Sequence, residues 1–207
     1  SKTLRTLLSA GTVLGVCALT QPPVHAEDAA PDQAVLDRGA YIATASDCIA
    51  CHTKPGSQPF AGGLKIATPM GDVISTNITP DPERGIGKYT EQDFEQAVRH
   101  GVRKDGAYLH PVMPYVSYAG MTDQDVHALY MWFMHSVKPV ASTPAETTLV
   151  FPANMRSPMA AWNFVTPKED PESADSSTSA PLRRGKYLTN ALEPLGTLHH
   201  PPNLMLR

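Results

Sequence analysis

The stretch that decides the fold is GAYIATASDCIACHT, residues 39–53, in which two cysteines are separated by two residues and followed at once by a histidine. Cysteines with this spacing occur in redox pairs, in metal half-sites and in covalent haem attachment. A zinc site needs two further soft ligands, and the one other cysteine of the chain is Cys17, near its start. A thioredoxin-like pair needs a strand–helix–strand context, for which the sequence shows no pattern. The histidine that follows the second cysteine therefore favours haem attachment over a redox pair or a metal half-site, because C-x-x-C-H is the attachment signature of haem c.

The spacing of this motif has a physical reason. Two thiols at the end of a helix can each add to one vinyl group of the porphyrin, and the adjacent histidine then lies under the iron. We therefore predict that Cys48 and Cys51 attach one haem c covalently and that His52 is an axial iron ligand. A carbonyl of Pro55 or Pro59 is expected to accept the other ring N–H of His52 and so orient the ring.

The sixth ligand of such an iron is a methionine or a histidine. The downstream candidates are Met70, His100, His110, Met113, Met121, Met131 and Met134. Met113 is preferred, because Pro111 and Pro114 stiffen the loop that would hold its sulfur. His100 and His110 remain the alternatives, as stronger nitrogen ligands or as solvated surface groups. A Met/His pair leaves no open position on iron, which favours electron relay over catalysis by this chain itself.

The composition excludes several other functions. The formal net charge is -3, which is too small to indicate nucleic-acid binding, and aromatic residues make up only 7% of the chain. Near the start, Lys2 and Arg5 precede an apolar run over residues 7–19 and a small-residue cleavage site, VHA, at residues 24–26. This pattern predicts that residues 1–26 are a cleaved signal peptide and that the protein is periplasmic.

Helical signals fill the next hundred residues. Asp32, Thr90 and Thr122 are each predicted to cap a helix, because an apolar stripe at helical spacing follows each of them. Residues 55–87 are rich in glycine and proline and are expected to be mostly loop. The pattern indicates a small all-α domain with long loops, assigned to residues 27–140.

Beyond this domain the composition changes twice. Residues 141–181 are predicted to be a partly apolar strap followed by a flexible linker. The apolar residues expected to pack back on the domain are Phe151, Met155, Trp162 and Phe164. Residues 184–188, RGKYL, then repeat residues 38–42, RGAYI. The repeat predicts that residues 182–207 begin a second, incomplete domain, since they are too few to bury a core of their own.

Three segments together resemble one family. They are the motif segment at 39–53, FAGGLKIATPMGDVISTNITPDPERGIGKYTEQDFEQAVRHGVRKDG at 60–106, and MPYVSYAGMTDQDVHALYMWF at 113–133. The chain resembles, over residues 33 to about 165, the first haem domain of the cytochrome c subunits of bacterial membrane-bound dehydrogenases. These subunits serve quinoprotein alcohol dehydrogenases and flavin-dependent gluconate, sorbitol or fructose dehydrogenases.

The resemblance implies a fold, a ligand and partners. The fold would be a class I cytochrome c-like domain, with Met113 of the MPY segment as the axial ligand. Electrons would pass from a catalytic subunit carrying PQQ or flavin towards ubiquinone, with peripheral association at the outer face of the cytoplasmic membrane. The alternative is a free, diffusible periplasmic cytochrome that donates electrons to an oxidase or a peroxidase.

The end of the chain departs from the family pattern. Family members carry three haem c domains and a C-terminal amphipathic anchor, whereas LGTLH stands at residues 195–199, where the second CxxCH is expected. Without thiols no thioether can form there, so one haem is predicted, and His199 has no attachment motif to serve. We expect a truncated or damaged form of a longer chain, with a natural single-haem variant as the alternative.

Overall fold

The computed structural model describes residues 31–155, 157–165 and 179–193. The predicted signal peptide, most of the predicted linker and residues 194–207 lie outside the described residues. The elements are α1 (Gln33–Ala45), α2 (Cys48–His52), β1 (Lys65–Thr68), β2 (Gly71–Ile74), α3 (Glu91–His100), α4 (Tyr115–Tyr118), α5 (Asp123–Ser136), β3 (Thr148–Leu149), α6 (Ser157–Val165), α7 (Ala180–Tyr187) and the π-helix η1 (Leu188–Leu192). Within the described residues, no helix combines the length and the apolarity needed to cross a membrane.

The three predicted helix starts are confirmed. The side chain of Asp32 accepts the N–H of Ala34 at the start of α1, at 3.0 Å. Thr90 and Asp93 form a reciprocal capping box at the start of α3, in which each side chain accepts the other's backbone N–H. Thr122 accepts a backbone N–H in the same way at the start of α5. Each cap satisfies donors that the first helical turn leaves open, which is why local sequence predicted them.

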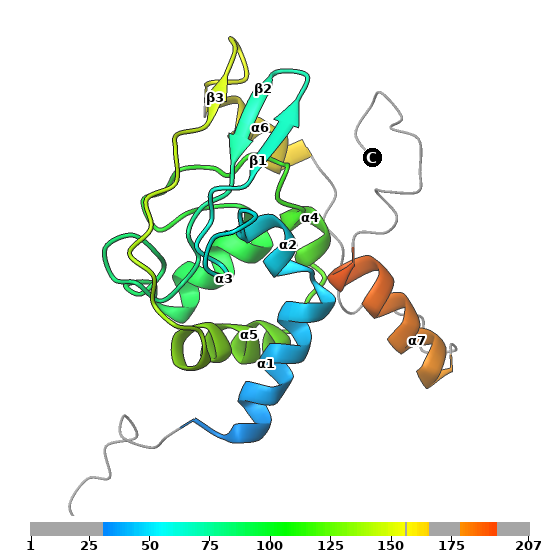
Figure 1. Cartoon of the computed structure of the whole chain (residues 1–207). Helices are drawn as coiled ribbons and strands as arrows, with labels where there is room; N and C mark the ends of the chain where they lie inside the picture. Colours follow the sequence, from blue (N-terminus) through cyan, green and yellow to red (C-terminus); the bar gives the residue numbers. More distant parts are fainter. Residues whose placement is uncertain (1–30, 156, 166–178, 194–207) are drawn as a thin grey trace, which may run out of the picture. The chain divides into compact units, whose positions relative to one another are not determined.

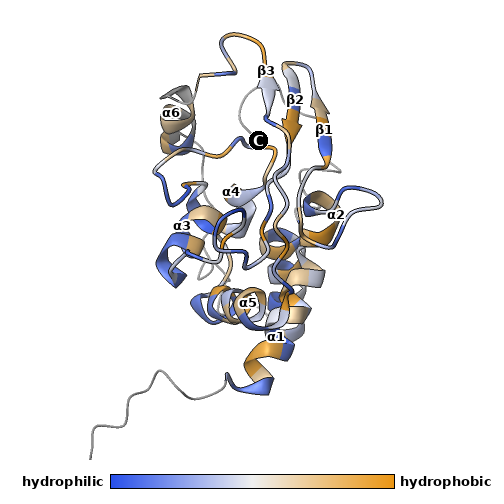
Figure 2. Cartoon of the chain, turned by 60° about the vertical axis from the view of Figure 1, so that its left-hand side comes forward, coloured by the Kyte–Doolittle hydropathy of each residue, from blue (hydrophilic) through white to orange (hydrophobic). Residues whose placement is uncertain are grey.

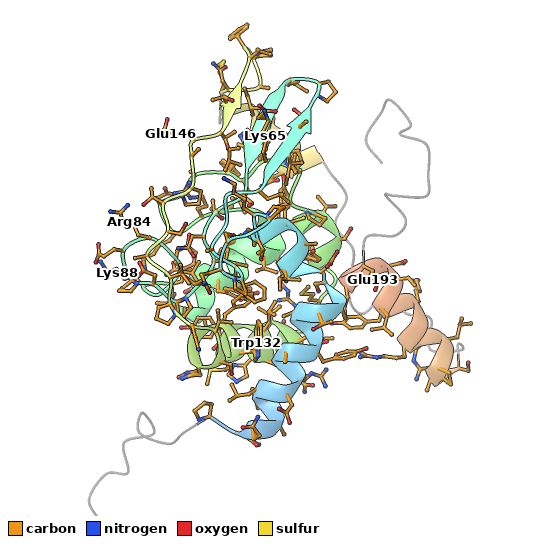
Figure 3. All side chains as sticks on the ribbon, in the orientation of Figure 1. Lys65, Arg84, Lys88, Trp132, Glu146 and Glu193 are labelled. Carbon is orange, nitrogen blue, oxygen red and sulfur yellow. The ribbon has the colours of Figure 1, made fainter. Side chains whose placement is uncertain are left out.

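The crossing of α1 and α5 organises the core (Figure 1). A Cβ on Gly39 of α1 would lie 2.1 Å from the carbonyl oxygen of Ala128 and 2.5 Å from the Cβ of Trp132, so only glycine permits this approach. Trp132, labelled in Figure 3, lies on α5 at this crossing. Its ring and that of Phe133 both pack edge-on against Phe60, with centroids 5.5 Å and 5.3 Å away, an arrangement that aromatic pairs favour.

A three-stranded antiparallel sheet, in the order β1-β2-β3, was not predicted. β1 and β2 form a hairpin in which Lys65 pairs with Ile74, and β3 pairs with the first two residues of β2, Gly71 and Asp72. A Cβ on Gly71, whose φ is +120°, would lie 2.3 Å from the carbonyl oxygen of Thr148, so this glycine admits β3. Helices are therefore the main content, as expected, but the all-α prediction omitted this sheet. The glycine and proline content of residues 55–87 indicated a loop where β1 and β2 form, and β3 comes more than seventy residues after β2.

The apolar residues of the strap do not all pack back on the domain. Phe151 is 77% exposed, Phe164 is 90% exposed and Met155 is also exposed, whereas the side chain of Trp162 is outside the described set. Figure 2 shows apolar colour on the chain segment that follows β3. α6 is nevertheless anchored, since the amide of Asn163 donates to the carbonyl of His100 at 2.8 Å. The expectation of packing was therefore wrong for Phe151, Met155 and Phe164.

The start of the predicted second domain packs onto the first. Leu192 of η1 is fully buried and belongs to the same hydrophobic core as α1 and α5. The hydroxyl of Tyr187 donates to the carboxylate of Asp125, which is buried and also paired with Arg38. Burial, together with the hydrogen bond to Asp125, raises the pKa of Tyr187 to about 12, so this hydroxyl remains a donor at neutral pH. Residues 187–192 therefore complete the core of the domain that precedes them.

Replacing Leu192 with alanine tests this packing. Loss of a fully buried leucine leaves a cavity, so the Leu192→Ala variant is expected to lose about 2–5 kcal/mol of unfolding free energy in urea titration. Leu182→Ala is the control, because Leu182 of α7 is 64% exposed, and its loss is expected to change the unfolding free energy by less than about 0.5 kcal/mol. Equal effects of the two substitutions would contradict the packing of η1 in the core.

Candidate haem-attachment site

The two cysteines and the histidine lie together on α2, a single helical turn. α1 ends at Ala45 with Ser46 as its C-cap, and Asp47 adopts a left-handed conformation with φ 50°, which turns the chain before α2 begins. Asp is among the few non-glycine residues that adopt this conformation readily. Because residues three apart share a helix face, the thiols of Cys48 and Cys51 lie on one side of the turn, and His52 ends it.

The two thiols differ in burial but share a protonation state. Cys48 packs against the hydrophobic core, and burial raises the pKa of its thiol to about 12. Cys51 is exposed, and its pKa is also raised, again chiefly by desolvation. Reactive redox cysteines have lowered pKa values, so this pair does not resemble a thioredoxin-like site. Among the described residues, no three His, Cys, Asp or Glu side chains group closely enough to hold a metal ion.

One ring nitrogen of His52 is fixed by the backbone. Its Nδ1 lies 2.8 Å from the carbonyl oxygen of Thr76, and since a carbonyl only accepts, Nδ1 carries the proton. The lone pair is then on Nε2, the atom that can bind iron. Burial lowers the pKa of His52, against the hydrogen bond to Thr76, and so favours this neutral ring. The expected acceptor was a carbonyl of Pro55 or Pro59, and that prediction was wrong.

Gly62 brings Thr76 to the histidine. Its N–H donates to the carbonyl of His52 at 2.8 Å, which places the Gly62 backbone directly beside the motif. A Cβ on Gly62 would lie 2.6 Å from the carbonyl oxygen of Thr76 and 2.5 Å from its carbonyl carbon, and the φ of Gly62 is +72°. Both the space and the backbone conformation therefore require glycine here. Sequence reasoning missed Thr76 and Gly62, although the Gly62-Gly63 pair was a visible sign of close backbone approach.

Met113 lies in a turn held on both sides. Its N–H donates to the carbonyl of His110 at 3.1 Å, and its own carbonyl accepts the N–H of Tyr115 at 2.8 Å. The hydroxyl of Tyr118, on the helix that follows, donates to the carbonyl of Ser46 at 2.8 Å, two residues before the first cysteine of the motif. Met113 and Cys48 also pack against the same hydrophobic core. The structure thus ties the Met113 turn to the motif segment.

The other candidate ligands have different surroundings. Met121 is fully buried in the core, and Met134 packs against that core from α5. Met70 is exposed in the turn between β1 and β2, in the sheet rather than in the core. His100 and His110 are half-buried rather than solvated, and the carbonyls of both accept hydrogen bonds.

The residues present fit a covalently held haem. Two protonated thiols on one face of a helical turn suit addition to two vinyl groups, and a neutral imidazole with its lone pair on Nε2 suits binding of iron. The half-buried thioether of Met113 is a soft donor of the kind that such iron accepts as a second ligand.

Comparison with known proteins gives clear relatives. The chain is 46% identical over 189 residues to the cytochrome c subunit of the quinone-dependent alcohol dehydrogenase of Gluconobacter oxydans, covering 91% of this chain and 39% of that subunit. It is 46% identical over 183 residues to the gluconate 2-dehydrogenase cytochrome c subunit of Pantoea cypripedii, covering 88% and 41% of the two. For the fructose dehydrogenase cytochrome subunit of Gluconobacter japonicus, identity is 41% over 206 residues, covering 96% and 42%.

These relatives confirm the resemblance inferred from the sequence. No protein-family model matches the chain. The chain spans about two fifths of the length of the three relatives.

Substitution of Gly62 tests the architecture of the site. Gly62→Ala places a methyl group against the Thr76 peptide, and we expect it to lower the unfolding free energy by about 1–3 kcal/mol beyond the cost of its backbone conformation. Gly56→Ala is a matched control, because Gly56 also has a positive φ, +80°, but a Cβ there would meet no described atom within 4 Å. The control is expected to cost only about 1–2 kcal/mol, the conformational penalty alone.

The two alanine variants, Gly62→Ala and Gly56→Ala, are expected to differ in unfolding free energy. If urea titration gives the two alanine variants the same unfolding free energy, the close approach of Gly62 to Thr76 is wrong. The yield of covalently bound haem should also fall in Gly62→Ala but not in Gly56→Ala.

Proposed function

Because this chain is homologous to the cytochrome c subunits of alcohol, gluconate and fructose dehydrogenases, we propose that it is a periplasmic electron-transfer subunit of such a dehydrogenase complex. The cofactor is haem c, one in the described domain, attached through Cys48 and Cys51 with His52 and Met113 as axial ligands. Its partner is a catalytic subunit that carries PQQ or flavin, and the electrons pass on towards ubiquinone.

Haem c, when bound, supplies a one-electron iron couple. The chain's own residues do the rest. The thiols of Cys48 and Cys51 fix the group to α2, and His52 presents Nε2 while Thr76 holds its other nitrogen. Met113 offers a second protein ligand from a turn between His110 and Tyr115, which would leave iron no open position for a substrate. The protein therefore relays electrons and does not itself bind what the complex oxidises.

The observation that carries this proposal is the state of His52. A histidine whose Nδ1 donates to a backbone carbonyl is oriented and kept in one tautomer, which is how metal-binding histidines are commonly supported. That it directly follows two thiols on one helix face separates this site from a disulfide or a zinc half-site.

Exposed apolar residues favour a subunit over a freely diffusing cytochrome. Val150, Phe151 and Met70 are all exposed. The N–H of Val150 donates to the carbonyl of Met70 at 2.8 Å, so this part of the strap lies beside the hairpin turn. Adjacent exposed apolar side chains are often found where a protein contacts a partner, which supports the subunit proposal. Location at the outer face of the cytoplasmic membrane, through the complex, is part of the same proposal.

Replacing Met113 tests the axial ligand. Met113→Ala removes the sulfur, so the absorption spectrum of the purified haem protein is expected to change in both oxidation states and its reduction potential to fall. Met70→Ala is the control, because Met70 is exposed in the hairpin turn, and its spectrum should match that of the unmodified protein. An unchanged spectrum in Met113→Ala would show that Met113 is not a ligand.

Affinity purification from a native host tests the subunit assignment. The tagged chain is expected to bring down a quinoprotein or flavoprotein dehydrogenase in a fixed stoichiometry, and substitution of Phe151 with serine should weaken this association. Leu182→Ser, which also replaces an exposed apolar residue, serves as the control. A chain that carries haem but always elutes as a monomer would favour the diffusible cytochrome.

A further inference from the structure

Asn77, the residue after Thr76, uses the whole hydrogen-bonding capacity of its side chain. Its Nδ2 donates to the carbonyl oxygens of Val140 at 2.7 Å and Ser142 at 3.1 Å. Its Oδ1 accepts the backbone N–H of Thr79 at 2.9 Å and the Thr79 hydroxyl at 2.8 Å. A carboxamide has two donors and two acceptor positions, so this one is saturated, and at 4% exposure it has almost no contact with water.

Thr79 extends this network to the strap. Its hydroxyl also accepts the N–H of Val140 at 3.1 Å, and its carbonyl accepts the N–H of Ile86 at 2.8 Å. Arg84, labelled in Figure 3, donates to the hydroxyl of Thr143. Asn77 and Thr79 are therefore hydrogen-bonded to Val140 and Ser142, where the strap begins. Buried networks with every group satisfied are rigid.

The other side of Thr76 is anchored independently. The N–H of Ser75 donates to the carbonyl of Leu64 at 2.9 Å, and the Ser75 hydroxyl accepts the N–H of Leu64 at 2.9 Å. The carbonyl of Ser75 accepts the N–H of Gly63 at 2.8 Å. The peptide that faces His52 thus lies between two hydrogen-bonded residues, Ser75 and Asn77, which restrict the rotation of its carbonyl.

We propose that Asn77 is a positioning residue for the iron ligand: it links the strap to Thr76 and so holds the Thr76 carbonyl against Nδ1 of His52. The inference rests on the proposed function, because it concerns iron bound to His52. A hydrogen bond from Nδ1 to a fixed carbonyl makes the imidazole a stronger electron donor, which favours the oxidised iron. Asn77 therefore lowers the reduction potential of the haem without touching either ligand.

The test measures potential and ligand orientation together. Asn77→Ala removes all four hydrogen bonds, so the midpoint potential of the purified haem protein is expected to rise. A tenfold change in the reduction equilibrium corresponds to about 59 mV for one electron, and the expected rise is on the order of this value. The electron paramagnetic resonance g values of the ferric protein should shift as well, since they depend on the orientation of the imidazole.

Two threonine-to-valine substitutions distinguish a specific effect on the Thr76 carbonyl from a general loosening of the strap. Thr79→Val removes the hydroxyl that donates to Asn77, while the side-chain volume and charge stay the same. It therefore tests the role of Asn77 if Asn77→Ala does not fold. Thr147→Val removes a different bond of the strap, the one from the N–H of Ile74 to the Thr147 hydroxyl, 3.0 Å long. Thr79→Val should raise the potential and shift the g values, and Thr147→Val should leave both unchanged.

Two outcomes overturn the proposal. One is a wild-type potential and wild-type g values in Asn77→Ala or, where that variant does not fold, in Thr79→Val, even if stability falls. The other is an equal shift in Thr147→Val, which would mean that any loosening of the strap suffices. If the unmodified protein lacks covalent haem, the proposed function itself fails, and that result is visible before any variant is made.

Discussion

The hydrogen bond between Nδ1 of His52 and the carbonyl of Thr76 is the constraint on which the site depends. It fixes the tautomer, the ring plane and the direction of the Nε2 lone pair at once. Three features support this hydrogen bond. Gly62 has no side chain to clash with the Thr76 peptide, Ser75 and Asn77 hold that peptide from either side, and the turn at Asp47 starts α2. In the proposed function the thiols would hold the haem in place, and this contact would orient the histidine that binds the iron.

Sequence predicted the parts of the fold that depend on near neighbours. The caps at Asp32, Thr90 and Thr122 need residues two or three positions apart, and each formed as expected. The acceptor for His52 lies 24 residues away in the chain, and the pairing of β3 with β2 joins segments still farther apart. No local pattern encodes these distant contacts, so β3 was missed and the acceptor of His52 was assigned to prolines nearby. The β1–β2 hairpin is local, and it was missed because the glycine and proline content of residues 55–87 indicated a loop.

The internal repeat shows how one sequence pattern can serve two purposes. In RGAYI, Gly39 lets α1 approach α5 so closely that any side chain would clash. In RGKYL, a Cβ at Gly185 would meet no described atom within 4 Å, while Tyr187 and the nearby Leu192 pack onto the preceding domain. The repeat predicts the start of a new domain, but it did not reveal that Tyr187 and Leu192 pack into the core of the preceding domain.

The proposed function requires thioether bonds from Cys48 and Cys51 to a haem. Mass spectrometry of the proteolytic peptide that carries residues 48–52 tests for these bonds most directly. Material purified from the periplasm of a host able to mature c-type cytochromes is required. The predicted result is a peptide heavier by one haem, with neither Cys48 nor Cys51 available to a thiol reagent. The same peptide at its bare mass, with both thiols alkylated, would contradict the account.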